Sequence, residues 1–94
     1  MQTLILHAAA LRGRGDCAGA IELVEDHEAN QRFADDFRVP AYLQCFYAAV
    51  EGGLTSKANE YARKIAGLDA GVPSVQAYLV IQERRATTSK PEEQ

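Results

Sequence analysis

The side chains of this 94-residue chain that could do chemistry are two histidines, two cysteines and one short acidic cluster. The cluster runs from Glu25 to Glu28 and contains His27, so it offers acid–base groups or metal ligands, although such a run is usually a solvated helical face. The second histidine, His7, is expected on the packed side of another helix, and neither histidine belongs to an HExxH or His–Cys motif. No serine, threonine or cysteine has a recognisable partner base. We therefore expect no enzyme activity, no bound metal and no cofactor.

Charge and cysteine usage restrict the class of partner. Ten basic and thirteen acidic residues give a net charge of −3, and the basic residues are scattered rather than gathered into a stripe. This distribution weighs against nucleic acid or an anionic membrane as the main ligand. Cys17 and Cys45 lie in apolar helical segments without CxxC spacing, which favours reduced, buried thiols and a cytoplasmic location.

The first secondary-structure element that the sequence predicts is a helix at the N-terminus. The segment MQTLILHAAALRGRG contains two arginines, but they follow its apolar run, whereas a secretory signal carries its basic residues first. The run is also too short to span a bilayer. Because Leu4, Ala8 and Leu11 fall on one helical face, we expect a structural first helix rather than a targeting segment.

Apolar periodicity and helix breakers predict five helices and no other long element. They are expected at about 2–12, 17–33, 40–51, 56–66 and 73–85. Asp16 should cap the second helix, and Thr55 or Ser56 the fourth. Pro40 should open the third helix, since proline suits a first turn, and Gly67 should end the fourth.

The second and fourth helices have an apolar face that predicts the core. The residues expected to be buried are Ala20, Ile21, Leu23 and Val24 in the second helix and Ala58, Tyr61, Ala62 and Ile65 in the fourth. The glutamates expected to face solvent are Glu22, Glu25 and Glu28. One domain over 1–86 accounts for these helices, and the polar residues 87–94 are expected to form a flexible tail.

Two stretches of the chain repeat each other, GDCAGAIELVED at 15–26 and GLTSKANEYARK at 53–64. The matched positions, all separated by one and the same interval, are Leu4 and Tyr42, Leu11 and Ala49, Gly15 and Gly53, Ala20 and Ala58, and Glu22 and Glu60. We call this interval the repeat period. A fixed period of about 20–50 residues indicates a repeat architecture, in which each helical hairpin buries its apolar face against the next.

These residues resemble the tetratricopeptide repeat. The positions that match its pattern are Leu4, Ala8, Leu11, Gly15, Asp16, Ala20 and Val24 in the first copy and Tyr42, Ala49, Gly53, Ala58 and Ala62 in the second, which closes with GLDAG. The resemblance covers about 2–70 and implies an all-α fold: a right-handed stack of antiparallel hairpins, about two repeats plus a C-terminal capping helix.

The chain departs from the family pattern at several positions. It has no tryptophan at the first position, a large residue at Phe46 where a small one is usual, and no proline after Asp69. Its repeat period exceeds the family's usual length by about one helical turn. We expect that extra turn within EANQRFADDF, in the second helix or the loop after it.

In this family the first helix of each hairpin lines a concave binding face. The groove residues that the resemblance implies are Ile5, Ala9, Arg12, Leu43, Tyr47 and Val50. Some members of the family bind acidic C-terminal peptides through basic and asparagine side chains at these positions, and here only Arg12 could do so. We therefore expect the groove to bind an apolar or amphipathic segment of a partner protein instead. An adaptor or small chaperone would have this function, like the type III secretion chaperones that the chain is similar to in length. The alternative is that these residues only pack on neighbouring helices.

A second interface is expected on the fifth helix. Its consecutive apolar residues Tyr78, Leu79, Val80 and Ile81 cover more than one helical face, whereas the last helix of a stack is normally polar outside. A second copy of the chain, another subunit or the partner segment would cover them.

The sequence also resembles the pentatricopeptide repeat, a related family that binds single-stranded RNA one base per repeat. Base recognition there needs two polar residues per repeat, and only Gln44 with Ser74 could serve in this chain, since Leu6 and Val39 are apolar. Under this alternative Gln44→Ala would weaken binding, whereas Tyr47→Asp would weaken binding of a protein segment.

Overall fold

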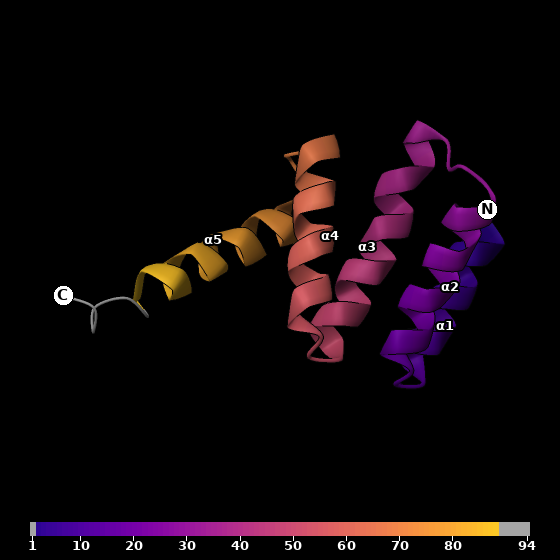
Figure 1. Ribbon diagram of the computed structural model, residues 1–94, viewed down its shortest axis with the longest axis horizontal. Coiled ribbons are helices and arrows are strands. Elements are labelled where there is room, and N and C mark those ends of the chain that lie inside the picture. The colour runs from indigo at the N-terminus through magenta and orange to yellow at the C-terminus, as the bar shows by residue number, and fades with distance from the viewer. Residues whose placement is uncertain (1, 89–94) are drawn as a thin grey trace.

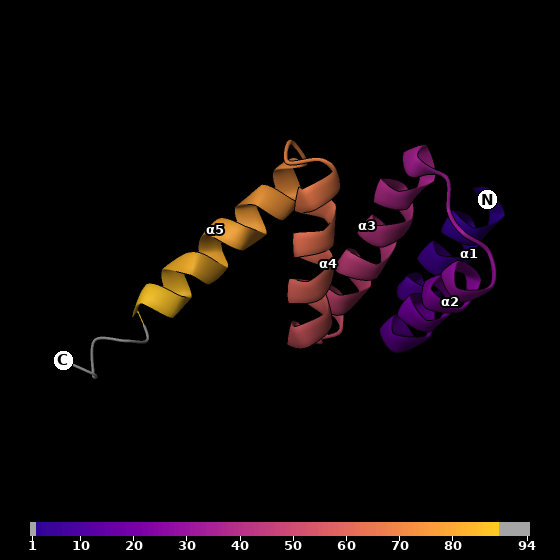
Figure 2. The ribbon, with the colours of Figure 1, turned by 45° about the horizontal axis from the view of Figure 1, so that its top comes forward.

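The computed structural model describes residues 2–88, with side chains for 3–85, and these residues form five helices (Figure 1). In chain order they are α1 (Gln2–Gly13), α2 (Cys17–Asn30), α3 (Asp35–Glu51), α4 (Thr55–Leu68) and α5 (Pro73–Thr88). The first four make two antiparallel hairpins, and α5 projects from the end of α4 away from the others (Figures 1 and 2). The expected all-α stack of helical hairpins is confirmed.

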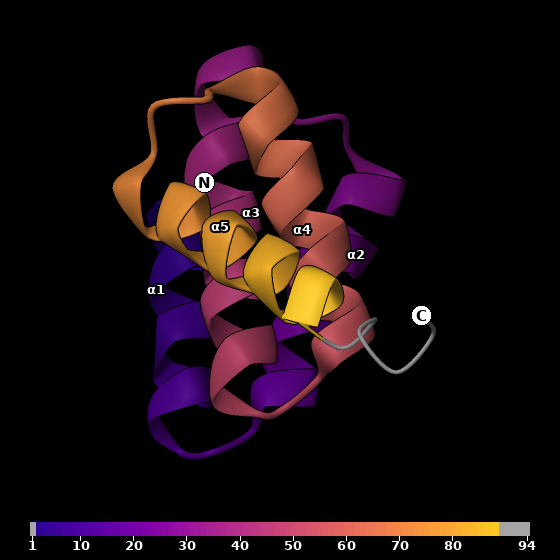
Figure 3. The ribbon, with the colours of Figure 1, turned by 90° about the vertical axis from the view of Figure 1, so that its left-hand side faces the viewer.

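The helices are arranged in two layers. Viewed from the α5 end, α1 and α3 lie in one layer and α2 and α4 in the other, while α5 crosses in front of the stack (Figure 3). Helix α3 is central, because it packs against α1, α2 and α4, whereas α5 packs mainly on α4. The molecule is elongated, with extents of 50 × 27 × 22 Å. None of the described helices is both long enough and apolar enough to cross a bilayer.

The two hairpins close with the same turn. Gly15 and Gly53 have φ values of +85° and +70°, the left-handed region that favours glycine. In each turn the next amide reaches back to the preceding helix: Asp16 N donates to Leu11 O at 2.9 Å, and Leu54 N donates to Ala49 O at 2.8 Å. This pattern satisfies carbonyls that the helix end leaves without partners.

The repeat period extends to the helix ends. Helix α4 begins and ends one full period after α2, and α5 begins one full period after α3. The residues that follow α2 and α4, Gln31 and Asp69, are both extended, with φ of −151° and −153°. Each also donates its amide to the carbonyl four residues earlier. Pro73 therefore stands where the first helix of a third hairpin would begin.

The core combines small residues at helix crossings with a few large side chains. The buried alanines are Ala8, Ala20, Ala41, Ala48, Ala49, Ala58 and Ala62. The largest fully buried side chains are Tyr61, Ile65, Val24, Val75 and Cys45. Of the eight predicted core residues, Leu23 alone is only partly buried. Both cysteines are buried and free, as predicted.

Two predicted helix boundaries between the hairpins are wrong. Helix α2 ends at Asn30 rather than near 33, because Phe33 leaves the helical path to enter the core, where its ring meets Phe37 edge-on at 5.1 Å. Helix α3 begins at Asp35, so Pro40 lies inside it rather than at its start. Two aspartates in its first turn suit the positive end of the helix dipole. The segment expected to hold an extra turn supplies the end of α2, the linker and the first turn of α3.

The predicted caps are partly correct. Asp16 caps α2, since its Oδ1 accepts a hydrogen bond from Gly19 N at 3.0 Å. Leu54 rather than Thr55 or Ser56 precedes α4, without a side-chain bond, and α4 continues through Gly67 to Leu68. Two residues assigned to the tail, 87 and 88, belong to α5, and the remainder, 89–94, lies outside the described residues.

Two glutamates expected to face solvent instead connect neighbouring helices. Glu25 Oε2 accepts hydrogen bonds from Lys57 Nζ and Tyr61 Oη, both at 2.7 Å, and so joins α2 to α4. Glu28 accepts one from the hydroxyl of Tyr42 on α3. These bonds satisfy two tyrosine hydroxyls that burial would otherwise leave without partners.

The Glu25 bonds predict a pH dependence of stability. Burial alone would raise the pKa of Glu25. The hydrogen bonds from Lys57 and Tyr61 lower this pKa by more than burial raises it, so the pKa lies below the ordinary value for glutamate. A carboxylate with a depressed folded-state pKa stabilises the fold above its unfolded pKa of about 4.3 and loses that contribution as pH falls through the folded value. We expect Glu25→Gln to lower the urea midpoint near neutral pH and to approach the wild type below about pH 4.

The measurement is urea unfolding followed by circular dichroism at several pH values. Glu22→Gln is the matched control, because Glu22 is exposed on the same helix. A Glu25→Gln defect of constant size across the whole pH range would contradict this role.

Candidate partner-binding groove

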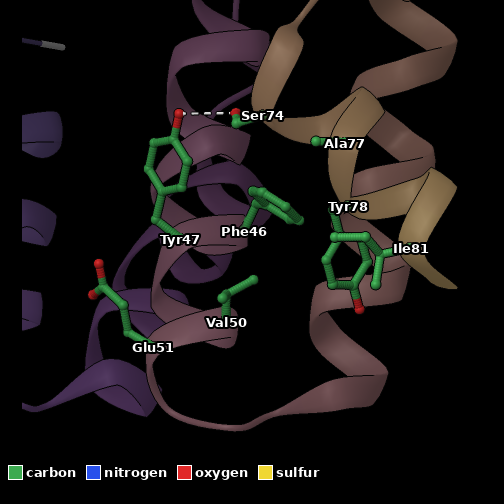
Figure 4. Close-up of a pocket in the computed structure, with 8 residues that line it drawn as sticks. All are labelled: Phe46, Tyr47, Val50, Glu51, Ser74, Ala77, Tyr78 and Ile81. Atoms are coloured by element: carbon green, nitrogen blue, oxygen red, sulfur yellow. Dashed lines mark hydrogen bonds between the residues drawn. The ribbon is translucent and has the colours of Figure 1, made fainter.

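An apolar hollow of about 350 Å³ lies between α3 and α5 (Figure 4). Its lining residues are Phe46, Tyr47, Val50 and Glu51 from α3 and Ser74, Ala77, Tyr78 and Ile81 from α5. Figure 4 shows the two rows of side chains on either side of the hollow. We call this hollow the α3–α5 groove.

Helical spacing brings these side chains to one side of each helix. On α5, Ser74, Ala77 and Ile81 follow one another at intervals of three and four residues, which places them on one face. Next to this face, α5 is anchored to the stack: Val75 is buried, and Tyr78 Oη donates to Asn59 Oδ1 of α4 at 2.6 Å. The groove therefore exists because α5 is anchored near its start and then diverges from the stack (Figure 2).

The groove has a buried floor and one closed end. Phe46 forms the floor and meets the Tyr78 ring edge-on at 5.2 Å. At one end Tyr47 Oη and Ser74 Oγ share a hydrogen bond of 3.2 Å, which ties α3 to α5. Val50 and Ile81, which line the hollow from α3 and from α5, remain 48% and 50% exposed. The walls thus offer apolar surface that the described part of the chain does not cover.

The charges beside the groove neutralise each other. Arg12 reaches from α1 to hold Glu51 through two hydrogen bonds of 2.7 and 3.1 Å, and it also donates to Gln44 Oε1 at 2.8 Å. Its guanidinium lies 5.1 Å from the centre of the Tyr47 ring. The hydrogen bond between the pair raises the pKa of Arg12 and lowers that of Glu51. The one cation among the predicted groove residues is thus already engaged within the chain.

The predicted groove residues do not all meet at one place. Tyr47 and Val50 line the α3–α5 groove, and Arg12 packs beside it on Tyr47. The other three, Ile5, Ala9 and Leu43, are partly buried and do not line this groove. For these three, the groove role and the alternative of simple packing both stay predictions.

The predicted second interface is divided by the structure. Tyr78 and Ile81 line the α3–α5 groove, and Leu79 is partly buried against the core. Val80 is 48% exposed and does not line the groove, so what covers it stays a prediction. Ile81 lies one repeat period after the predicted groove residue Leu43, so carrying the period into the fifth helix would have found it.

Sequence reasoning missed four lining residues, Phe46, Glu51, Ser74 and Ala77. In the sequence, Phe46 stands out only as a departure from the repeat pattern. The other three carry no signal, since their contribution depends on the angle between α3 and α5.

The residues that would support RNA recognition are engaged elsewhere. Gln44 accepts from Arg12, and Ser74 bonds to Tyr47. In the first repeat, the positions that would read a base hold the apolar residues Leu6 and Val39. Leu6 is exposed and Val39 is partly buried. RNA binding stays a prediction that no contact of the described residues favours.

The histidines lie apart from the groove. His7 is exposed rather than packed, and it shares a hollow between α1 and α2 with His27. His27 Nδ1 is 3.0 Å from the carbonyl of Leu23. Among the described residues, no cluster of three or more histidine, cysteine or acidic side chains has an arrangement that could hold a metal ion.

Comparison of the chain with known protein families, with characterised proteins and with solved structures finds no significant match.

Proposed function

We propose that this protein is a non-catalytic interaction module, an adaptor or small chaperone, that holds an apolar segment of a partner protein in the α3–α5 groove. The observation that carries the proposal is the apolar groove itself, with a buried aromatic floor and two large, half-exposed aliphatic walls. A groove between two helices suits an amphipathic helix, whose apolar anchors recur every three or four residues. The likeness to helical-repeat proteins, which bind partners on such faces, supports the same function.

The occupant in this proposal is a segment of another protein rather than residues 89–94 of this chain. The residues that follow α5, SKPEEQ, contain no large apolar side chain that could fill an apolar groove. The groove is tied at the Tyr47–Ser74 end and bordered along its sides by α3 and α5, so a bound helix would run between them toward Val50 and Ile81.

The proposal is tested by selecting peptides from a displayed library of random sequences against the purified chain. We expect enrichment of sequences with large apolar residues at helical spacing. Val50→Asp should weaken binding of the selected peptides about a hundredfold, because it places a carboxylate against a wall that must be desolvated. Its thermal melt should match the wild type, since Val50 is 48% exposed.

Val80→Asp is the matched control. Val80 is also a 48% exposed valine on the same molecule, but it lies outside the groove lining. Its variant should bind the selected peptides with wild-type affinity. A selection without enrichment, or peptides that bind Val50→Asp as well as the wild type, would refute the proposal. Peptides that lose binding to Val80→Asp would place the site on the outer face of α5.

A further inference from the structure

A second, smaller hollow of about 130 Å³ adjoins the α3–α5 groove. Val50 and Tyr78 line both hollows, so the two lie side by side. The second hollow lies between the turn that joins α3 to α4 and the middle of α5. The groups that distinguish it from the groove are the Thr55 hydroxyl, the Gln82 amide and the Arg85 guanidinium. Its size and its hydrogen-bonding groups suit a small polar group, whereas the groove suits an apolar one.

Arg85 gives the second hollow a positive charge that its lining does not compensate. No acidic side chain is among the residues that line it. Within the described residues, Arg85 forms no salt bridge, in contrast to Arg12, which is held by Glu51. Among the described residues, Glu51, the acid that lines the groove, is therefore neutralised by Arg12, while Arg85 has no such acidic partner. An anionic group on the partner would complement this arrangement.

The spacing on α5 fixes where the anionic group would lie. Arg85 follows Ile81 by four residues, which is one helical turn, or about 6 Å along the helix axis. A bound segment whose apolar anchor contacts Ile81 would therefore present its anionic group about one turn away. In a helical segment that distance corresponds to an acidic residue three or four positions from the anchor.

We infer that the partner segment carries an aspartate or glutamate about one turn from its apolar anchors, and that Arg85, assisted by Gln82 and Thr55, binds this carboxylate. The inference rests on the proposed function and specifies the chemistry of its partner. A guanidinium binds a carboxylate in a fixed, two-bond geometry, so the contact sets the direction in which the segment lies. The apolar groove supplies most of the affinity, and the Arg85 contact supplies specificity.

The test uses the tightest peptide from the selection, synthesised with an amidated C-terminus so that its side chain is the only carboxylate source near the anchors. A second peptide replaces the acidic residue by its amide. We expect the acidic peptide to bind the wild type about three- to tenfold more tightly than the amide peptide, and Arg85→Gln to abolish that difference. Arg85→Glu should instead favour a peptide with lysine at the same position.

Arg84→Gln is the matched control, because Arg84 is also an exposed arginine of α5 but lines neither hollow. It should keep the preference for the acidic peptide. Selected peptides without an acidic residue at this spacing, or equal affinities of the two peptides for the wild type, would overturn the inference. Either result leaves the groove proposal standing as long as Val50→Asp weakens binding as expected, so the two failures are distinguishable.

Discussion

The Tyr61→Ala variant is expected to lose about 3–5 kcal/mol of unfolding free energy. Tyr61 is 1% exposed, and its ring lies 5.6 Å from that of Tyr42 and 5.0 Å from Lys64 Nζ. Its hydroxyl donates to Glu25 at 2.7 Å, so one side chain links α4 to α2 and packs on α3. A domain of this length is stable by only about 5–14 kcal/mol, so the variant should be partly unfolded or easily denatured.

Urea unfolding followed by far-ultraviolet circular dichroism measures this loss. Tyr61→Phe is the control, because it keeps the ring and removes only the hydroxyl. It should cost about 1–2 kcal/mol, the usual penalty for losing a buried hydrogen bond. If both variants lost the same amount, the packing of the ring would not have the role that we assign to it.

The Phe46→Ala variant is expected to lose a similar amount, about 3–5 kcal/mol, and to loosen α5 as well. Phe46 is buried beneath the α3–α5 groove, and its ring contacts those of Tyr47 and Tyr78. Helix α5 packs mainly on α4, so the loss of the Phe46–Tyr78 contact removes one of its few attachments to the stack. Peptide binding should fall with it, since the groove would lose its floor.

Hydrogen exchange of the backbone amides separates the two effects. In Phe46→Ala, the amides of α5 should lose more protection than those of α2, because local detachment requires less free energy than global unfolding. Phe46→Leu, which keeps most of the volume, should retain protection in α5. Uniform loss of protection over all helices would show that Phe46 does not secure α5 in particular.

The repetition within the sequence is sufficient to predict the architecture. Gly15 and Gly53 occupy matched positions in the two copies, and both adopt the same left-handed conformation. The boundaries between hairpins are harder to predict, because tertiary contacts decide them. Phe33 enters the core and so ends α2 early, while Pro40 is tolerated inside α3, where it costs a single backbone hydrogen bond.

The groove is only partly predictable, for a geometric reason. Periodicity identifies the face of α3 that carries Tyr47 and Val50, but not the angle at which α5 leaves the stack. That angle follows from the burial of Val75 and the bond between Tyr78 and Asn59, and neither contact has a sequence signal. The pairing of Arg12 with Glu51 is likewise a contact between separate helices that helical spacing does not show.

The central claim is that a partner segment binds between α3 and α5, and nuclear magnetic resonance tests it most directly. A peptide from the selection would be titrated into the ¹⁵N-labelled protein while amide shifts are recorded. We predict that the largest changes fall on residues 46–51 of α3 and 74–85 of α5, with little change along α2. Changes concentrated on α2 and the outer face of α4, with α5 unaffected, would contradict the account.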